Sequence, residues 1–128
     1  AVPKDFAKKI KQEIDLKGAT VLPGLIECHT HSVFAGSRAH EFELRNQGVS
    51  YLEIAKQGGG IQSTVREVRK EKLQYLLKLA QKRVDQFVSQ GVSTLEIKSG
   101  YGLDLPSELK MLKVIQSLKG PHIVPTFL

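Results

Sequence analysis

The sequence predicts an α/β fold in which parallel strands are joined by helical connections. Three short apolar segments, residues 24–28, 92–98 and 122–128, are typical of strands. Residues 63–90, between the first two segments, show the periodicity of a long helix, and a second helical pattern follows residue 104. Connections of this length require parallel strands within one sheet. Because such folds bind ligands at the carboxyl ends of their strands, the loops after the first two strands are the expected site.

Shorter elements are expected on either side of the first strand. Three apolar residues that alternate with polar ones predict an earlier strand, namely Ile10, Ile14 and Leu16. That strand should end in a turn at Lys17-Gly18. Further along, residues 40–45 have the mixed polarity of a helical turn. Ser50 and Glu53 form the S-x-x-E pattern of a capping box, which places a short helix over residues 51–57.

Two longer amphipathic helices follow. The first covers residues 63–90, and Gly91 is its stop signal. Its apolar stripe comprises Leu73, Leu77, Ala80, Val84, Phe87 and Val88. The second helix has Asp104 as its N-cap and Pro106 in its first turn. Its stripe comprises Leu109, Leu112, Ile115 and Leu118.

Composition places the 128 residues among ordinary globular proteins, with 41% hydrophobic and 25% charged residues. No apolar run reaches the ~18 residues of a membrane span, and the N-terminal sequence lacks the apolar core of a secretory signal. The net charge of +6 is spread along helical segments without interleaved aromatic residues, which favours a solvated surface over a nucleic-acid site.

The single cysteine, Cys28, excludes an internal disulfide and favours a reducing compartment, so a cytoplasmic location is expected. Its place in the first strand predicts a small buried core residue. The chain begins at Ala1 and ends on an apolar strand at Leu128, and we therefore expect it to be a piece of a longer protein.

Two histidines, His29 and His31, directly follow the first strand. Residues two apart on a strand point to the same face, so both imidazoles can reach one point beyond its end. Two neutral imidazoles form half of a first-row metal site, although a lone His-x-His is also found as a chance surface pair. The apolar strand before the pair and the glycine-containing loop after it favour a ligand pair.

A metal held by two histidines needs one or two further ligands and an open position, and these are not evident here. His40 lies beyond the next loop and is expected at the surface. His122 begins the third strand, at the opposite end of the sheet. Glu27 shares the face of His29 but lies deeper, which favours a supporting or core role. The site is therefore expected to be incomplete within this chain.

Several stretches resemble a known family. P-G-L-I-E-C-H-T-H resembles the first barrel strand of the amidohydrolase superfamily. The runs H-T-H-S-V-F-A-G-S-R-A-H-E-F, G-G-G-I-Q-S-T and E-I-K-S-G-Y-G-L-D-L-P-S-E-L-K-M-L closely resemble the imidazolonepropionase family of histidine degradation, which belongs to that superfamily. The similarity extends from about Ile14 to Leu128, and K-S-G-Y-G-L-D-L is its most specific part.

The resemblance implies a metal-dependent hydrolase of a cyclic amide. Such an enzyme adds water to 4-imidazolone-5-propanoate and opens the ring to N-formimidoyl-L-glutamate. His29 and His31 match the family's first two ligands of one divalent metal, zinc or iron. Arg38 and Tyr101 match residues that bind the substrate. The family's later ligands and its catalytic acid and base would lie beyond Leu128, so no catalytic residue is expected within this chain.

The resemblance also implies a fold and an assembly. Residues 1–22 match the end of a small β-sandwich domain. Residues 23–128 match the first three strand–helix units of a (β/α)8 TIM barrel. The full-length parent would be a cytoplasmic homodimer acting on a small molecule, with no nucleic-acid or membrane partner.

Some of these residues have simpler interpretations without the family match. Arg38 would be an exposed loop residue, and Tyr101 a residue that packs its loop. The glycines at 58–60 could offer backbone N–H groups to a substrate carboxylate, although a linker that ends a helix is simpler. Lys98 is expected to be a structural residue or one that supports the site from behind the ligands, rather than a metal-bridging lysine. Two alternative functions remain: another amidohydrolase, such as a deaminase or a different cyclic amidase, and a non-catalytic α/β module.

Overall fold

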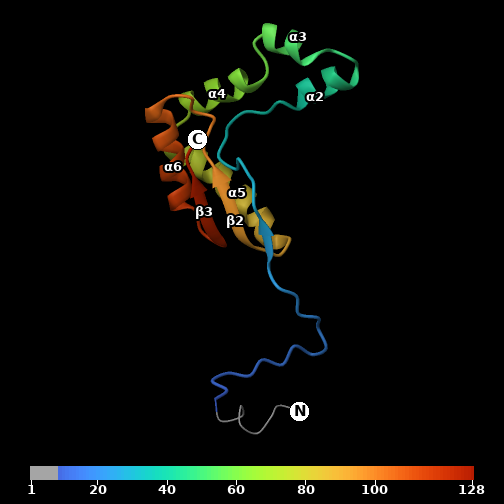
Figure 1. Cartoon of the computed structure of the whole chain (residues 1–128), viewed down its shortest axis with the longest axis vertical. Coiled ribbons are helices and arrows are strands. Elements are labelled where there is room, and N and C mark those ends of the chain that lie inside the picture. Colours follow the sequence, from blue (N-terminus) through green and yellow to red (C-terminus); the bar gives the residue numbers. More distant parts are fainter. Residues whose placement is uncertain (1–8) are drawn as a thin grey trace.

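A computed structural model describes residues 9–128 and contains the expected alternation of strands and helices (Figure 1). The elements are β1 (Leu25–Glu27), α2 (Ala39–Asn46), α3 (Tyr51–Lys56), α4 (Ile61–Lys70), α5 (Leu73–Ser89), β2 (Val92–Lys98), α6 (Leu105–Ser117) and β3 (His122–Thr126). None of the described helices is both long enough and apolar enough to cross a bilayer.

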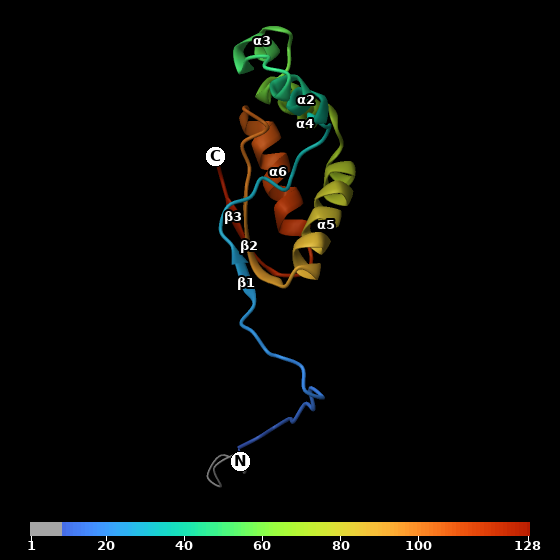
Figure 2. The ribbon, with the colours of Figure 1, turned by 90° about the vertical axis from the view of Figure 1, so that its right-hand side faces the viewer.

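The three strands form one parallel sheet in the order β1-β2-β3, which confirms the predicted topology. Glu27 at the end of β1 pairs with Leu95, and Lys98 at the end of β2 pairs with Thr126 of β3. Helices α5 and α6 lie against one face of this sheet (Figure 2). Helices α2 and α3 lie beyond the carboxyl ends of the strands, as Figure 1 shows. The loops that follow β1 and β2 therefore emerge at the same end of the sheet.

The core lies between the sheet and the two long helices. Leu95 and Ile97 of β2 are fully buried on this side, whereas Glu96 alternates onto the other face. That face and the free strand edges leave large apolar side chains exposed, among them Leu25, Ile26, Val124 and Phe127. Exposed apolar surface on a sheet is characteristic of a face that another element covers.

Local capping signals predicted the helix starts correctly. Ser50 caps α3 and forms the complete capping box with Glu53. Asp104 caps α6 by accepting a hydrogen bond from the Ser107 N–H at 2.8 Å. The helical turn expected at residues 40–45 is the longer helix α2.

The single helix predicted over residues 63–90 is two helices, α4 and α5, so that prediction was wrong. The backbone becomes extended at Glu71, the residue after α4. Lys110 of α6 donates hydrogen bonds from Nζ to carbonyl oxygens at this point, at 2.7, 3.2 and 2.9 Å from those of Val68, Arg69 and Glu71. A cation stabilises the free carbonyl groups at a helix end, so a residue from a distant part of the chain supports the break.

The apolar stripes were predicted only in part. Val88 of α5 and Leu109 of α6 are exposed, although both belong to the predicted stripes. Residues outside those stripes are fully buried instead: Leu76, Met111 and Val114. The two helices pack on each other as well as on the sheet, so their buried faces are wider than one stripe.

Two predictions near the N-terminus were also wrong. Residues 10–16 form no strand, although the turn at Lys17-Gly18 is present with positive φ at both residues. Cys28 is exposed rather than buried, because β1 ends before it and no described element covers its side chain. The sandwich segment predicted over residues 1–22 falls partly on residues 1–8, which lie outside the described residues, and its described part contains no strand.

Candidate metal and substrate site

The predicted ligand pair lies directly after β1. The ring centroids of His29 and His31 are 5.6 Å apart. The Nδ1 atom of His31 is buried and has no hydrogen-bond partner among the described residues. A buried ring nitrogen without a partner is costly, so this atom suits a metal ion. No group of three or more His, Cys, Asp or Glu side chains within residues 9–128 is placed to hold a metal.

The segment that carries the histidines is fixed to β2 and α5. The hydroxyl of Thr30 donates to the carbonyl oxygen of Glu96 at 2.7 Å. From α5, Nη1 of Arg83 donates to the carbonyl oxygens of Ser32 and Phe34, both at 2.9 Å. The same guanidinium lies 3.5 Å from the centroid of the Phe34 ring. The backbone is therefore fixed on both sides of the second histidine.

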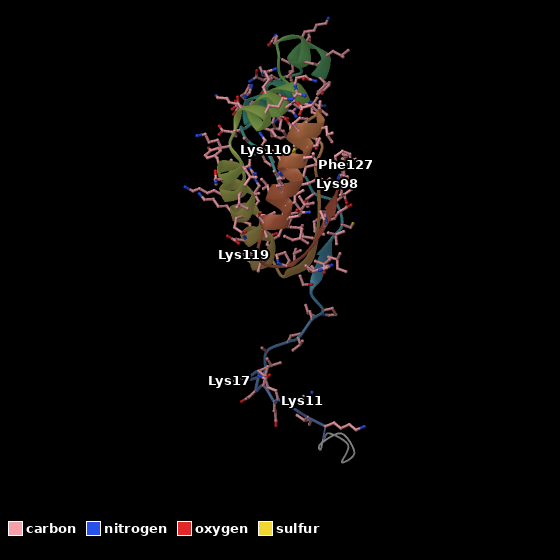
Figure 3. The ribbon with its side chains drawn as sticks, turned by 90° about the vertical axis from the view of Figure 1, so that its left-hand side faces the viewer. Lys11, Lys17, Lys98, Lys110, Lys119 and Phe127 are labelled. Atoms are coloured by element: carbon pink, nitrogen blue, oxygen red, sulfur yellow. The ribbon has the colours of Figure 1, made fainter. Side chains whose placement is uncertain are left out.

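A charged pair lies on the open face of the sheet. Glu96 accepts hydrogen bonds from the Thr126 hydroxyl at 2.7 Å and from Nζ of Lys98 at 3.0 Å. These two bonds hold the pKa of Glu96 below its ordinary value, although burial opposes them. Lys98 lies at the carboxyl end of the sheet (Figure 3) and pairs with Glu96.

The loop after β2 is held by Glu108, a residue that is only 3% exposed. Its carboxylate accepts hydrogen bonds from three backbone N–H groups, those of Gly100 and Gly102 at 2.6 Å and that of Leu103 at 2.8 Å. Burial raises the pKa of Glu108, but a hydrogen bond with the Ser99 side chain and the three backbone bonds outweigh it and lower the pKa overall. The loop is therefore fixed around a buried anion.

Tyr101 occupies the middle of this loop and connects two parts of the site. Its ring centroid is 5.1 Å from that of His31 and 6.3 Å from that of Phe34. Tyr101 and Arg38 also line one cleft of about 330 Å³. The other lining residues are Phe34, Gly36, Ser37 and Thr64. The structure thus brings Tyr101 next to His31 and to Arg38, whereas neither histidine lines this cleft.

Arg38 is held by an ion pair with Glu41. Its Nε donates to Oε2 of Glu41 at 2.8 Å, and its side chain remains 36% exposed. The other carboxylate oxygen accepts from the N–H of Gly60 at 3.0 Å. The N–H groups of Gly58 and Gly59 donate to carbonyl oxygens of α3. Since all three glycine N–H groups have partners within the chain, none is free for a substrate carboxylate.

The remaining candidates are placed as expected. His40 is exposed on α2, and His122 begins β3 at the amino end of the sheet. Glu27 accepts a hydrogen bond from the backbone N–H of His29 at 3.1 Å and so supports the histidine segment.

The sequence interpretation missed the two buried glutamates, Glu41 and Glu108. Both lie in the first turn of a helix that follows a glycine-containing loop. Acids are stabilised in the first turn of a helix, so this position alone does not distinguish an exposed acid from a buried one. The spacing of three residues between Arg38 and Glu41 was the available sign of their ion pair.

Comparison with known proteins gives close relatives. The chain is 59% identical over 128 residues to an imidazolonepropionase of Bdellovibrio bacteriovorus, covering 99% of this chain and 30% of that protein. It is 58% identical over 116 residues to an imidazolonepropionase of Pseudomonas aeruginosa, covering 91% of this chain and 28% of that protein. The resemblance to the imidazolonepropionases is confirmed.

A third imidazolonepropionase, from Klebsiella pneumoniae, is 59% identical over 107 residues, covering 84% of this chain and 26% of that protein. The chain thus spans less than a third of the length of these relatives. No protein-family profile matches it.

Proposed function

We propose that this chain is part of an imidazolonepropionase, a metal-dependent hydrolase that adds water to 4-imidazolone-5-propanoate and yields N-formimidoyl-L-glutamate. The observation that carries the proposal is the 59% identity to an imidazolonepropionase over 99% of the chain. The positions of His31, Tyr101 and Arg38 support it, since Tyr101 contacts the histidine and lines one cleft with the arginine.

His29 and His31 would hold the metal, zinc or iron. When bound, the metal would polarise the ring carbonyl and lower the pKa of a bound water toward about 7. Arg38 binds the propanoate carboxylate through charge-assisted hydrogen bonds, for which a guanidinium is the best-suited side chain. Tyr101 donates its hydroxyl to a polar atom of the ring. The remaining ligands and the catalytic acid and base come from other parts of the longer protein.

The proposed fold is the first part of a (β/α)8 barrel, with residues 23–128 as three strand–helix units and residues 1–22 as the end of a β-sandwich. The parallel order of β1, β2 and β3 supports it, as do the two helices that lie on one face. The exposed apolar residues of the other face would line the barrel interior. There they would contact strands from other parts of the longer protein. A cytoplasmic homodimer that acts on a small molecule completes the proposal.

The test is turnover by the full-length protein that carries this segment, purified with its metal content measured. We expect ring opening of 4-imidazolone-5-propanoate, with both metal content and turnover lost on His29→Ala or His31→Ala. A metal-loaded wild-type protein that does not hydrolyse this substrate would overturn the proposal. Release of ammonia from the exocyclic amino group of a heterocycle instead would point to a deaminase of the same superfamily.

A further inference from the structure

Glu41 is a buried carboxylate that joins two segments lying far apart in the sequence. It is only 4% exposed, although it lies in the short helix α2. One oxygen accepts from Nε of Arg38 at 2.8 Å, and the other accepts from the N–H of Gly60 at 3.0 Å. The first contact is with the loop before α2, and the second is with the glycine run before α4.

The glycine run approaches this carboxylate closely. A Cβ atom on Gly59 would come within 2.9 Å of Oε1 of Glu41 and within 2.7 Å of Cγ2 of Ile54. Gly60 has a φ of 70°, a conformation that favours glycine. The absence of side chains at these two positions therefore lets the turn close around Glu41.

Glu41 remains ionised in this position. Burial raises the pKa of Glu41, but hydrogen bonds with Arg38 and Gly60 and electrostatic interactions with neighbouring groups, chiefly Arg38, outweigh it and lower the pKa overall. The carboxylate at this point holds the guanidinium of Arg38 through its Nε edge.

The contact with Glu41 determines which donors of Arg38 stay free. A guanidinium carries five N–H donors, and Nε supplies one of them. No described residue accepts a hydrogen bond from the Nη atoms of Arg38, which lines the cleft beside Tyr101. The two Nη groups together match the two oxygens of a carboxylate in an end-on, bidentate arrangement.

We propose that Glu41 is a positioning residue for carboxylate recognition by Arg38. It holds Nε, ties Arg38 to the 58–60 turn, and leaves the Nη edge to receive the propanoate group end-on. This inference rests on the proposed function, because it assigns the ligand of Arg38 as the substrate's carboxylate.

The test compares Glu41→Gln with Glu43→Gln in the full-length, metal-loaded protein. Glu43 is an exposed residue of the same helix, so the control has the same chemistry without the contacts. An amide has one acceptor oxygen and cannot serve both Arg38 and Gly60. We expect E41Q to raise KM for imidazolone propanoate about tenfold, because one positioned charge-assisted hydrogen bond is lost. The kcat of E41Q should stay within about twofold of the wild-type value. E43Q should leave both values unchanged.

Two further measurements separate positioning from general support of the fold. E41Q should bind an imidazolone with an uncharged propyl chain as wild type does, since that compound offers no carboxylate. In an Arg38→Gln background, E41Q should raise KM no further, because its effect passes through Arg38. An unchanged KM in E41Q, a fall in kcat alone, an equal penalty with the uncharged compound, or additive effects in the double variant would each overturn the inference.

A structural readout keeps this inference distinguishable from the proposed function. Crystal structures of wild type, E41Q and E43Q need no turnover, and we expect the guanidinium of Arg38 to leave its position only in E41Q. An unmoved Arg38 in E41Q overturns the inference even if the enzyme is active. A moved Arg38 in a protein that cannot open the ring supports the positioning role and removes only the substrate assignment.

If E41Q does not fold, Glu41→Asp takes its place, because the shorter acid keeps the charge but cannot span both donors.

Discussion

Glu41 and Glu108 hold the two loops of the candidate cleft by different means. Glu108 lies within eight residues of all its backbone donors, and its partners, three N–H groups and the Ser99 side chain, are uncharged. Glu41 accepts from a charged side chain three residues away and from a backbone N–H nineteen residues away. The local carboxylate therefore determines the shape of one loop, whereas the bridging carboxylate determines the orientation of a cation.

This difference predicts different consequences of losing each acid. Removal of Glu108 leaves several backbone N–H groups without a partner inside the protein, which is a cost in folding energy. Removal of Glu41 leaves one N–H group and a guanidinium that can turn toward water. We therefore expect Glu108 variants to affect stability first and Glu41 variants to affect ligand binding first.

The largest expected effect is that of Glu108→Ala. It should destabilise the loop by about 3 kcal/mol, because a buried N–H group left unpaired costs about 1–3 kcal/mol; that of Gly102 is buried, and those of Gly100 and Leu103, being part-buried, add less. Hydrogen exchange of the Gly100, Gly102 and Leu103 amides in the full-length protein should then accelerate about a hundredfold, at about 1.4 kcal/mol per factor of ten. Glu43→Ala, an exposed control, should leave these amides unchanged. Slow exchange in Glu108→Ala would show that the loop is fixed by other contacts.

The second prediction concerns acid pH. The folded pKa values of Glu41 and Glu108 are lowered from the ordinary value of 4.5, so both favour the folded state fully above pH 4.5. Their contribution is lost as the pH falls below 4.5 and through the lowered pKa values. The free energy of unfolding of E41Q and of E108Q should therefore depend less on pH than that of wild type over this acid range. Parallel curves for wild type and either variant would contradict the pKa direction at that residue.

A smaller effect is expected from the helix caps next to the two acids. Asp104→Ala should destabilise the start of α6 by about 1 kcal/mol, and Ser50→Ala should do the same for α3. Asp104 also pairs with Nε of Arg69 at 2.9 Å, although both side chains are partly exposed and such a pair adds little. Exchange of the Ser107 and Glu53 amides measures the two losses separately. A much larger loss of stability in Ser50→Ala than in Asp104→Ala would show that the start of α3 contributes more to the stability of its surroundings than the start of α6 does.

Sequence reasoning succeeded where the deciding contacts are local and failed where they are distant. The capping box of Ser50, the N-cap at Asp104 and the strand at 92–98 each depend on neighbours within a few residues. The break between α4 and α5 is supported by hydrogen bonds from Lys110, which lies outside residues 63–90. No local pattern predicts such a contact, because its partners lie 39 to 42 residues away in the sequence.

The same distinction applies to the candidate site. Strand alternation predicted that His29 and His31 share one face, but β1 ends at Glu27 and both histidines lie beyond it. Arg38 and Tyr101 came from the family resemblance. The exposure of Cys28 was missed because it depends on how far β1 extends and on what lies over it. The contact between Glu41 and Gly60 was missed because it needs a close approach of two loops that the sequence does not encode as a motif.

The smallest expected effect is a difference in salt dependence between the two acids. The Glu41 contact includes the charge of Arg38, whose side chain is 36% exposed, so dissolved ions reach it. Raising the ionic strength from 0.1 to 1 M shortens the Debye length from about 10 Å to about 3 Å, and the destabilisation by E41Q should fall by about 0.3 kcal/mol. The destabilisation by E108Q should not change, because the partners of Glu108 are uncharged dipoles. Urea unfolding of each variant against wild type at both salt concentrations measures the two differences. An equal salt dependence of the two destabilisations would mean that the charge of Arg38 does not add to the stability that Glu41 provides.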